Sequence, residues 1–363
     1  MSTLLITHDL GLAGEYCDRI IVMEQGGVVE QQDTAGLFTA PAHPYTRRLI
    51  RSTPHAAQNI RDLLPEDLRL PPPPLLSVSD EPLLEVKDLV KEYAPPRGLL
   101  QRLRGKGGAQ PFRAVDGIGF SIARGESVGL VGESGCGKST TSAMVMRLLD
   151  ATSGSIRFKG RELTAVPAGD FARSPLRREL QMVFQDPHES LNPRSTAAQS
   201  IADPLLRLEG MTDGAAIRAR VEQLAAQVGL PLELLDRLPH QLSGGQKARV
   251  GIARAIATKP ELLILDEPTA ALDVSVQAVV LNLLADLKAE FGMSYLFVSH
   301  DLEVVRLLCD RVIVMRAGSI VEAGPTARVL SDPQAEYTKE LLSAIPRPAH
   351  LAGHAAATRA VNA

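Results

Sequence analysis

The stretch GESGCGKST at residues 132–140 follows the apolar run SVGLVG (127–132) and opens the helical pattern STTSAMVMRLLD. It matches the phosphate-binding loop G-x-x-x-x-G-K-[ST] in the strand-to-helix context that this motif requires. Glycines let successive backbone N–H groups converge on phosphate oxygens at the start of a helix. We therefore predict a nucleotide phosphate site formed by Gly132, Glu133, Ser134, Gly135, Cys136, Gly137, Lys138, Ser139 and Thr140.

Within this loop, Lys138 is expected to contact the β and γ phosphates, and the Ser139 hydroxyl is expected to ligate Mg²⁺. A second apolar run, LLILDEP (262–268), places Asp266 at a strand end, where it would reach the metal through water. Glu267 follows directly and is predicted to polarise the attacking water. Taken alone, this set fits a helicase, a recombinase or a transport ATPase.

Composition argues against several classes of partner. Among 363 residues, 39 Lys and Arg stand against 42 Asp and Glu, for a formal net charge of -3. That balance gives no whole-chain attraction to nucleic acid or anionic lipid. Tryptophan is absent and aromatic residues make up 4%, so few side chains are suited to stacking on single-stranded bases. We expect no nucleic-acid partner.

Cysteine usage and hydropathy predict an intracellular chain. Cys17, Cys136 and Cys309 form no close pair and no metal-like spacing, which is typical of reduced thiols. No apolar run approaches the roughly 18 residues needed to cross a bilayer. The N-terminus lacks the basic and apolar regions of a secretion signal.

The chain contains an internal repeat. With an offset of 292, residues 1–54 align without a gap on residues 293–346, and about 22 positions are identical. MSTLLITHDL at the start thus matches MSYLFVSHDL at 293–302. Such similarity indicates a duplicated structural unit. The first copy matches only the end of that unit. The strands and loops that precede the second copy, such as the phosphate loop, have no counterpart in residues 1–54.

The pattern between residues 83 and 346 predicts an α/β domain. Short unbroken apolar runs alternate with helical segments, which is typical of a mostly parallel sheet covered on both faces. These runs include 127–132, 262–266, 295–299 and 311–315. Residues 197–239 instead show helical spacing without strand-like runs, and predict a helical insert.

A second glycine-rich stretch, LSGGQ, separates the ATPase classes. Together with VKEY, MVFQDP, ALD and VSHD it resembles the signature set of the ATP-binding cassette family, in the family order and over nearly all of residues 83–346. The resemblance implies that Tyr93 stacks on adenine, that Gln185 ligates Mg²⁺, that Asp273 belongs to the D-loop and that His300 contacts the γ-phosphate. It assigns the signature to Leu242, Ser243, Gly244, Gly245 and Gln246.

The same resemblance implies a fold and an assembly. The fold is that of a P-loop NTPase, with a RecA-like core, an antiparallel β subdomain and an α-helical subdomain. Two cassettes pack head to tail, and the signature of one closes over ATP held by the phosphate loop of the other. Ser243 and Gly245 would then contact the γ-phosphate of the second subunit's ATP. The cofactors implied are ATP and Mg²⁺.

Finer features resemble the peptide-importer branch, which serves dipeptide, oligopeptide, nickel and glutathione uptake. They include FQDPHESLNPR (184–194), DEPTAALDVSVQA (266–278) and the extension HPYTRRLI (43–50), which becomes AEYTKELL in the second copy. This branch implies an ATPase on the cytoplasmic face of the inner membrane. Its partners would be a second ATPase subunit, two transmembrane permeases and, indirectly, an extracytoplasmic solute-binding protein. The alternatives are a soluble non-transport cassette ATPase and an inactive remnant.

The repeat and these motifs together predict the domain organisation. The chain resembles a fused two-cassette protein cut just before the first switch histidine, His8, which would have no local site to complete. We expect its incomplete first copy to be poorly ordered. The basic insert at 97–112 fits a solvated loop or a contact with anionic lipid. The expected parts are a truncated first cassette (1–54), a proline-rich semi-rigid linker (55–82), the cassette domain (83–325, helical at about 186–258), a C-terminal extension (326–346) and a disordered tail (347–363).

Overall fold

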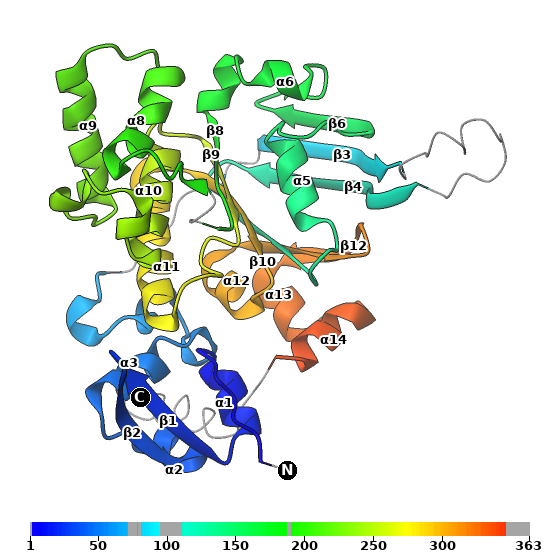
Figure 1. Cartoon of the computed structure of the whole chain (residues 1–363). Helices are drawn as coiled ribbons and strands as arrows, with labels where there is room; N and C mark the ends of the chain where they lie inside the picture. Colours follow the sequence, from blue (N-terminus) through cyan, green and yellow to red (C-terminus); the bar gives the residue numbers. More distant parts are fainter. Residues whose placement is uncertain (1, 72–77, 79–80, 95–110, 187–189, 346–363) are drawn as a thin grey trace, which may run out of the picture.

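The structure is a computed structural model that describes residues 2–71, 78, 81–94, 111–186 and 190–345 (Figure 1). Most of the insert at 97–112, most of the proline run and the whole tail at 347–363 lie outside these residues. Among the described residues, no helix combines the length and apolar character that a membrane crossing requires.

A six-stranded sheet forms the centre of the chain, in the order β12-β11-β5-β10-β9-β8. All neighbouring strands are parallel except β11 and β12. Because β5, β9 and β10 are buried along their whole length, they appear in the sequence as unbroken apolar runs. The six strands are β5 (Ser127–Val131), β8 (Leu180–Val183), β9 (Leu262–Asp266), β10 (Ser294–Ser299), β11 (Arg311–Arg316) and β12 (Ser319–Pro325).

A four-stranded antiparallel sheet packs over one face of this centre, in the order β4-β3-β6-β7. Its apolar side shares a core cluster with the central sheet and with α5, which lies beside it in Figure 1. The elements of this region are β3 (Pro82–Tyr93), β4 (Phe112–Ala123), α5 (Lys138–Val145), β6 (Ser153–Phe158), β7 (Arg161–Glu162), α6 (Ala168–Phe171) and η4 (Pro175–Arg178).

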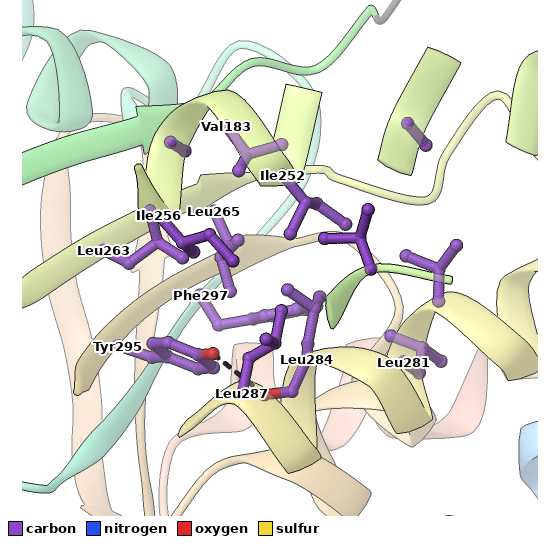
Figure 2. Packing of buried hydrophobic residues seen from close by; sticks show 14 of the residues in the cluster. Val183, Ile252, Ile256, Leu263, Leu265, Leu281, Leu284, Leu287, Tyr295 and Phe297 are labelled. Atoms are coloured by element: carbon purple, nitrogen blue, oxygen red, sulfur yellow. Dashed lines mark hydrogen bonds between the residues drawn. The ribbon is translucent and has the colours of Figure 1, made fainter. Parts of the chain in front are cut away.

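Helices cover the other face of the central sheet. Figure 2 shows Ile256 of α10, Leu265 of β9 and Leu284 of α11 packed around Tyr295, whose hydroxyl donates a 2.8 Å hydrogen bond to the Leu284 carbonyl. A helical region between β8 and β9 confirms the expected helical insert. The helical region contains α8 (Ala197–Arg207), α9 (Gly214–Gln227), η5 (Leu232–Leu234), η6 (Pro239–Gln241) and α10 (Gly244–Ile256). Two further helices, α11 (Val274–Phe291) and α12 (Leu302–Leu308), follow β9 and β10.

From α1 onward, every helix and strand of the first repeat has a counterpart in the second at the offset of 292, whereas β10 has none because residues 2–7 form no strand. Both contain a β-bulge at the same place, between Val22 and Met23 and between Val314 and Met315. The first repeat consists of α1 (Leu10–Tyr16), β1 (Arg19–Glu24), β2 (Gly27–Asp33), α2 (Thr34–Thr39) and α3 (Pro44–Arg51). After β12, the second repeat ends with α13 (Thr326–Ser331) and α14 (Glu336–Ser343).

The first repeat is folded but its sheet is incomplete. It has its own apolar cluster, in which Leu37 and Phe38 are fully buried, so it differs from the poor order expected from the sequence. However, β1 pairs with β2 alone in the described chain, whereas its counterpart β11 also pairs with β5. Ile21 is consequently 52% exposed, while the matching Ile313 is completely buried. This face of the repeat lacks the layer that α5 and β3–β4 supply in the second copy.

Residues after the first repeat pack onto the cassette, and the prediction of a spacer over 55–82 is therefore wrong for its first part. Ile60 and Leu63 join the main core cluster. Arg61 forms an ion pair with Asp286 of α11 and donates a 3.1 Å hydrogen bond to Asn282. The spacer was predicted from the proline run, but Ile60 and Leu63 lie before that run and are buried in the core. The turns are η1 (Pro54–Ala56), η2 (Ile60–Leu63) and η3 (Glu66–Leu68).

Candidate nucleotide site

The loop between β5 and α5 forms a tight backbone cradle. Gly132 and Gly137 adopt φ angles of 148° and 110°, in the left-handed region that favours glycine. A Cβ atom on Gly132 would lie 2.2 Å from the Met315 carbonyl oxygen, and one on Gly137 would lie 2.4 Å from that of Ala114. The glycines of the motif are therefore required by close contacts with β11 and β4, as well as by the turn itself.

Lys138 is buried at the first position of α5 and folds back over this loop. Its Nζ donates hydrogen bonds of 2.7 Å to the Gly132 carbonyl and 2.9 Å to the Glu133 carbonyl. The ammonium thus lies within the loop, where the sequence predicts phosphate oxygens. Ser134 and Gly135 are exposed at the loop surface. A cradle shaped by glycines and carrying an enclosed ammonium group fits a nucleotide's phosphates.

Two of the three metal-binding residues predicted from the sequence, Ser139 and Asp266, lie together. The Ser139 hydroxyl donates a 3.3 Å hydrogen bond to Oδ1 of Asp266, across from the end of β9. Burial raises the pKa of Asp266, and the hydrogen bond from Ser139 opposes that effect. Hydroxyl and carboxylate oxygens are the hard ligands that Mg²⁺ prefers. In the described ranges, no cluster of three or more His, Cys, Asp or Glu side chains could hold a metal, so a metal here would use the Ser139 hydroxyl beside the Asp266 carboxylate.

Glu267 is the point where the ends of three strands meet. Its Oε2 accepts a 3.0 Å hydrogen bond from Nε2 of Gln185, after β8, and lies 3.3 Å from Nδ1 of His300, after β10. The backbone of Glu267 has φ of 46°, a strained value for a residue with a side chain, and its N–H donates to the Val298 carbonyl. The side chains of Gln185, Glu267 and His300 therefore come together. The strained backbone of Glu267 is held in place by the surrounding structure.

Tyr93 reaches this region along the antiparallel sheet. It is the last residue of β3 and pairs with Phe112 at the start of β4. Two residues further along β4, the carbonyl of Ala114 lies close to Gly137 of the phosphate loop. Its ring is 44% exposed, and Nζ of Lys91 lies 5.3 Å from the ring centroid. An exposed aromatic ring near the loop is suited to stacking on a base.

The signature residues lie elsewhere, at the start of α10 in the helical region (Figure 1). Ser243 caps that helix through a reciprocal pair of hydrogen bonds with Gln246, at 2.9 and 3.3 Å. A Cβ on Gly245 would lie 2.5 Å from Cγ1 of Val276, whose N–H donates to Asp273 at the start of α11. The signature and the D-loop are thus packed together. In the part of the chain that the structure describes, no hydrogen bond joins residues 242–246 to residues 132–140.

The strand ends border a cavity of about 460 Å³, which the sequence did not predict. Gly132, Glu267 and His300 line one part of it, and His8 lines another. The first repeat thus brings His8, for which the sequence predicted no local site, to the wall of this cavity. The internal repeat was the available signal, but which surface the repeat packs against depends on tertiary contacts.

Comparison with known protein families identifies the family of the chain. Residues 115–270 match the ABC transporter family, and residues 29–74 and 321–361 both match the C-terminal region of oligopeptide and dipeptide transporters. The chain belongs to the ATP-binding cassette family of ATPases. Its fold is that of the family's P-loop nucleotide-binding domain.

Individual relatives of the chain are ATP-binding proteins described as acting in glutathione import. It is 42% identical over 362 residues to the glutathione import ATP-binding protein GsiA of Salmonella paratyphi A, covering 95% of this chain and 56% of the relative. The GsiA protein of Escherichia coli K12 is also 42% identical, over 357 residues. The chain thus spans about half the length of the curated relatives it matches.

Solved structures share the cassette fold. The protein described as cbiO1 from Clostridium perfringens, part of the ABC transporter complex cbiONQ, superposes with a TM-score of 0.59 at 30% identity, over 76% of this chain and all of that one. The ATP-binding cassette MJ0796, in a dimeric post-hydrolysis state bound to ADP and Pi, gives a TM-score of 0.58 at 28% identity. It covers 67% of this chain and 98% of its own.

Proposed function

We propose that the chain is the ATP-binding and ATP-hydrolysing subunit of an importer for peptides or a related solute, such as glutathione or nickel. One observation supports this above others: the segment that matches the ABC transporter family lies in the same chain as two segments that match the C-terminal region of oligopeptide and dipeptide transporters. The GsiA relatives, whose printed role is glutathione import, agree with it.

Binding would use the groups around the phosphate loop. The backbone of residues 132–140 donates N–H groups, and Lys138 supplies a positive charge already enclosed by the loop. Tyr93 offers its exposed ring to the base. Ser139 and Gln185 would ligate Mg²⁺ directly, and Asp266 would hold it through water. When bound, ATP supplies the phosphoryl group and Mg²⁺ supplies positive charge that the reaction requires.

Hydrolysis would depend on Glu267. Its carboxylate is positioned to accept a hydrogen bond from water and to polarise it. Gln185 and His300 both contact this carboxylate, and therefore fix its direction. His300 is 61% exposed at its side chain, so it can turn from Glu267 toward a bound phosphate.

Each complete site would take its second half from another cassette. The signature lies in the helical region, away from the phosphate loop of its own chain, so Ser243 and Gly245 are positioned to serve a neighbour. Asp273 packs beside them and would face the same interface. The dimer described for MJ0796 supports this arrangement. ATP would then hold two cassettes closed, and hydrolysis would release them.

The remaining partners follow from the importer role. Two permease subunits would bind between the helical region and the segment after Gln185, at the cytoplasmic face of the inner membrane. A solute-binding protein outside the cytoplasm would deliver the solute to them. Nothing in this proposal requires nucleic acid.

Measuring ATP hydrolysis by the chain alone and together with permease subunits of a peptide importer tests the proposal. We expect measurable hydrolysis that the permeases stimulate. Hydrolysis that is indifferent to the permeases would favour a soluble non-transport ATPase. Absence of both ATP binding and hydrolysis would favour an inactive remnant.

A further inference from the structure

The C-terminal extension is anchored firmly beside the phosphate loop. Glu322 of β12 accepts hydrogen bonds from the N–H groups of Gln334 and Ala335, at 2.9 and 3.0 Å. Burial raises the pKa of Glu322, but hydrogen bonds to its carboxylate outweigh this and leave the pKa below its usual range. These contacts fix the turn that begins α14. As a result, Tyr337 in the first turn of α14 is buried, with 4% exposure.

The hydroxyl of Tyr337 reaches the loop itself. It accepts a 3.2 Å hydrogen bond from the backbone N–H of Glu133, the second residue of GESGCGKST. The guanidinium of Arg316, the last residue of β11, lies 4.6 Å from the centroid of the Tyr337 ring. The ring is therefore held by a cation–π contact while its hydroxyl faces the loop.

The same loop residue also holds Lys138. The carbonyl of Glu133 accepts the 2.9 Å hydrogen bond from Nζ, while its N–H is bound to Tyr337. Both backbone polar groups of Glu133 are thus hydrogen-bonded. Its N–H is bound to Tyr337 of the extension, and its carbonyl is bound to the ammonium of Lys138. A shift at Tyr337 would move the carbonyl that places the charge of Lys138.

The first repeat shows that the extension does not need this contact to fold. Tyr45 occupies the same position in α3, which has the bounds of α14 at the repeat offset. Its ring lies 5.4 Å from the guanidinium of Arg48 on its own helix, and Glu24 stands where the second repeat has Arg316. The described residues of this copy (2–54) include no phosphate loop. The bond from Glu133 is therefore a feature of the nucleotide site and not of the extension's fold.

We propose that Tyr337 is a positioning residue of the nucleotide site. By fixing Glu133, its hydroxyl places the ammonium of Lys138 for phosphate binding, and the peptide-importer extension thereby sets the affinity of the cassette for ATP. This inference rests on the proposed ATP-binding function. It goes beyond that function because it assigns a part of the nucleotide site to a segment outside the matched cassette region, residues 115–270.

Two variants of the full chain test the inference. Tyr337→Phe removes the hydroxyl and retains the ring over Arg316, and Tyr45→Phe is the matched control in the other repeat. We expect amide exchange at Glu133, measured by NMR without nucleotide, to become about tenfold faster in Tyr337→Phe, because the N–H loses its acceptor. KM for ATP should rise about fivefold, as for the loss of one hydrogen bond, with kcat within twofold. Tyr45→Phe should leave all three values at those of the wild type.

The outcomes separate the two proposals. A Tyr337→Phe protein with wild-type exchange at Glu133 and a wild-type KM overturns the positioning role. A fall in kcat with KM unchanged overturns it as well, because the hydroxyl would then act on turnover and not on binding. If the wild type fails to bind ATP, the proposed function fails, whereas exchange at Glu133 still reports whether Tyr337 fixes the loop.

Discussion

Oε2 of Glu267 lies 3.3 Å from Nδ1 of His300, although the two residues follow different strands of the central sheet. The parallel neighbours β9 and β10 end at the same edge, and this topology brings the residues after them together. Gln185, which follows β8, completes the group. A carboxylate held from two sides is suited to directing one water molecule.

Replacing Glu267 tests that role. Glu267→Gln keeps the shape of the side chain but removes the carboxylate that polarises water, so ATP turnover should fall about 100-fold or more. Nucleotide binding should remain close to that of the wild type, measured by titration with a fluorescent ATP analogue. Glu209→Gln, at an exposed position in the helical region, is the control and should retain full turnover. Wild-type hydrolysis by Glu267→Gln would show that another group activates the water.

Replacing Lys138 should act on binding. Its ammonium lies inside the loop on two carbonyl groups, and it is the charge best placed to meet phosphate oxygens. We expect Lys138→Ala to weaken ATP binding about tenfold or more in the same titration. Lys259→Ala, which alters a residue after α10, is the control. An unchanged affinity in Lys138→Ala would exclude this loop as the phosphate site.

The packing of the segment after the first repeat can be tested through Arg61. Its guanidinium is 7% exposed and contacts Asp286 and Asn282 on α11. Arg61→Ala should lower the free energy of unfolding by about 2 kcal/mol, since hydrogen bonds to a charged group are lost. Arg51→Ala breaks only a surface pair with Glu66 and should cost less than about 0.5 kcal/mol. Equal effects in chemical denaturation would mean that the segment is not docked on α11.

Glu30 predicts a pH dependence in the first repeat. Burial by itself raises its pKa, but hydrogen bonds, including those from the N–H groups of Ala42 and His43, lower the pKa from 4.5 to about 2. Because the folded pKa is depressed, the contribution of Glu30 to stability is present above pH 4.5 and is lost as the pH falls towards 2.

The variant Glu30→Gln measures that contribution. It should lower the free energy of unfolding by about 2 kcal/mol at pH 7, and the difference from the wild type should shrink between pH 4.5 and 2. Chemical denaturation at several pH values provides the measurement. A difference that is constant over this range would show that the carboxylate charge does not stabilise the repeat.

Local sequence patterns predicted most of the fold. Fully buried strands such as β9 appear as apolar runs, and the glycines of the phosphate loop reveal the turn because close backbone contacts exclude other residues. The repeat offset of 292 carries over to every helix and strand of the first copy. In the site, the roles of Gln185 and His300 came from the resemblance to the cassette family, and the shared edge of the parallel strands explains why the structure brings both residues to Glu267.

Long-range packing accounts for what the sequence did not predict. Ile60 and Leu63 precede a proline run, and nothing local indicates that they enter the main core. Likewise, Tyr337 is 204 residues from Glu133, and its identical counterpart Tyr45 has no such bond, so the tyrosine alone could not reveal the contact. The position of His8 on the cavity wall depends in the same way on how the first repeat docks.

The central claim is that each nucleotide site is shared between two cassettes, and the mass of Glu267→Gln in solution tests it most directly. Sedimentation velocity should give a monomer without nucleotide and a dimer with ATP and Mg²⁺, since the variant binds ATP but cannot release the closed state. Adding Ser243→Arg, which places a bulky charge in the signature, should return the protein to a monomer. A Glu267→Gln protein that binds ATP yet stays monomeric, with or without permease subunits, would contradict the account.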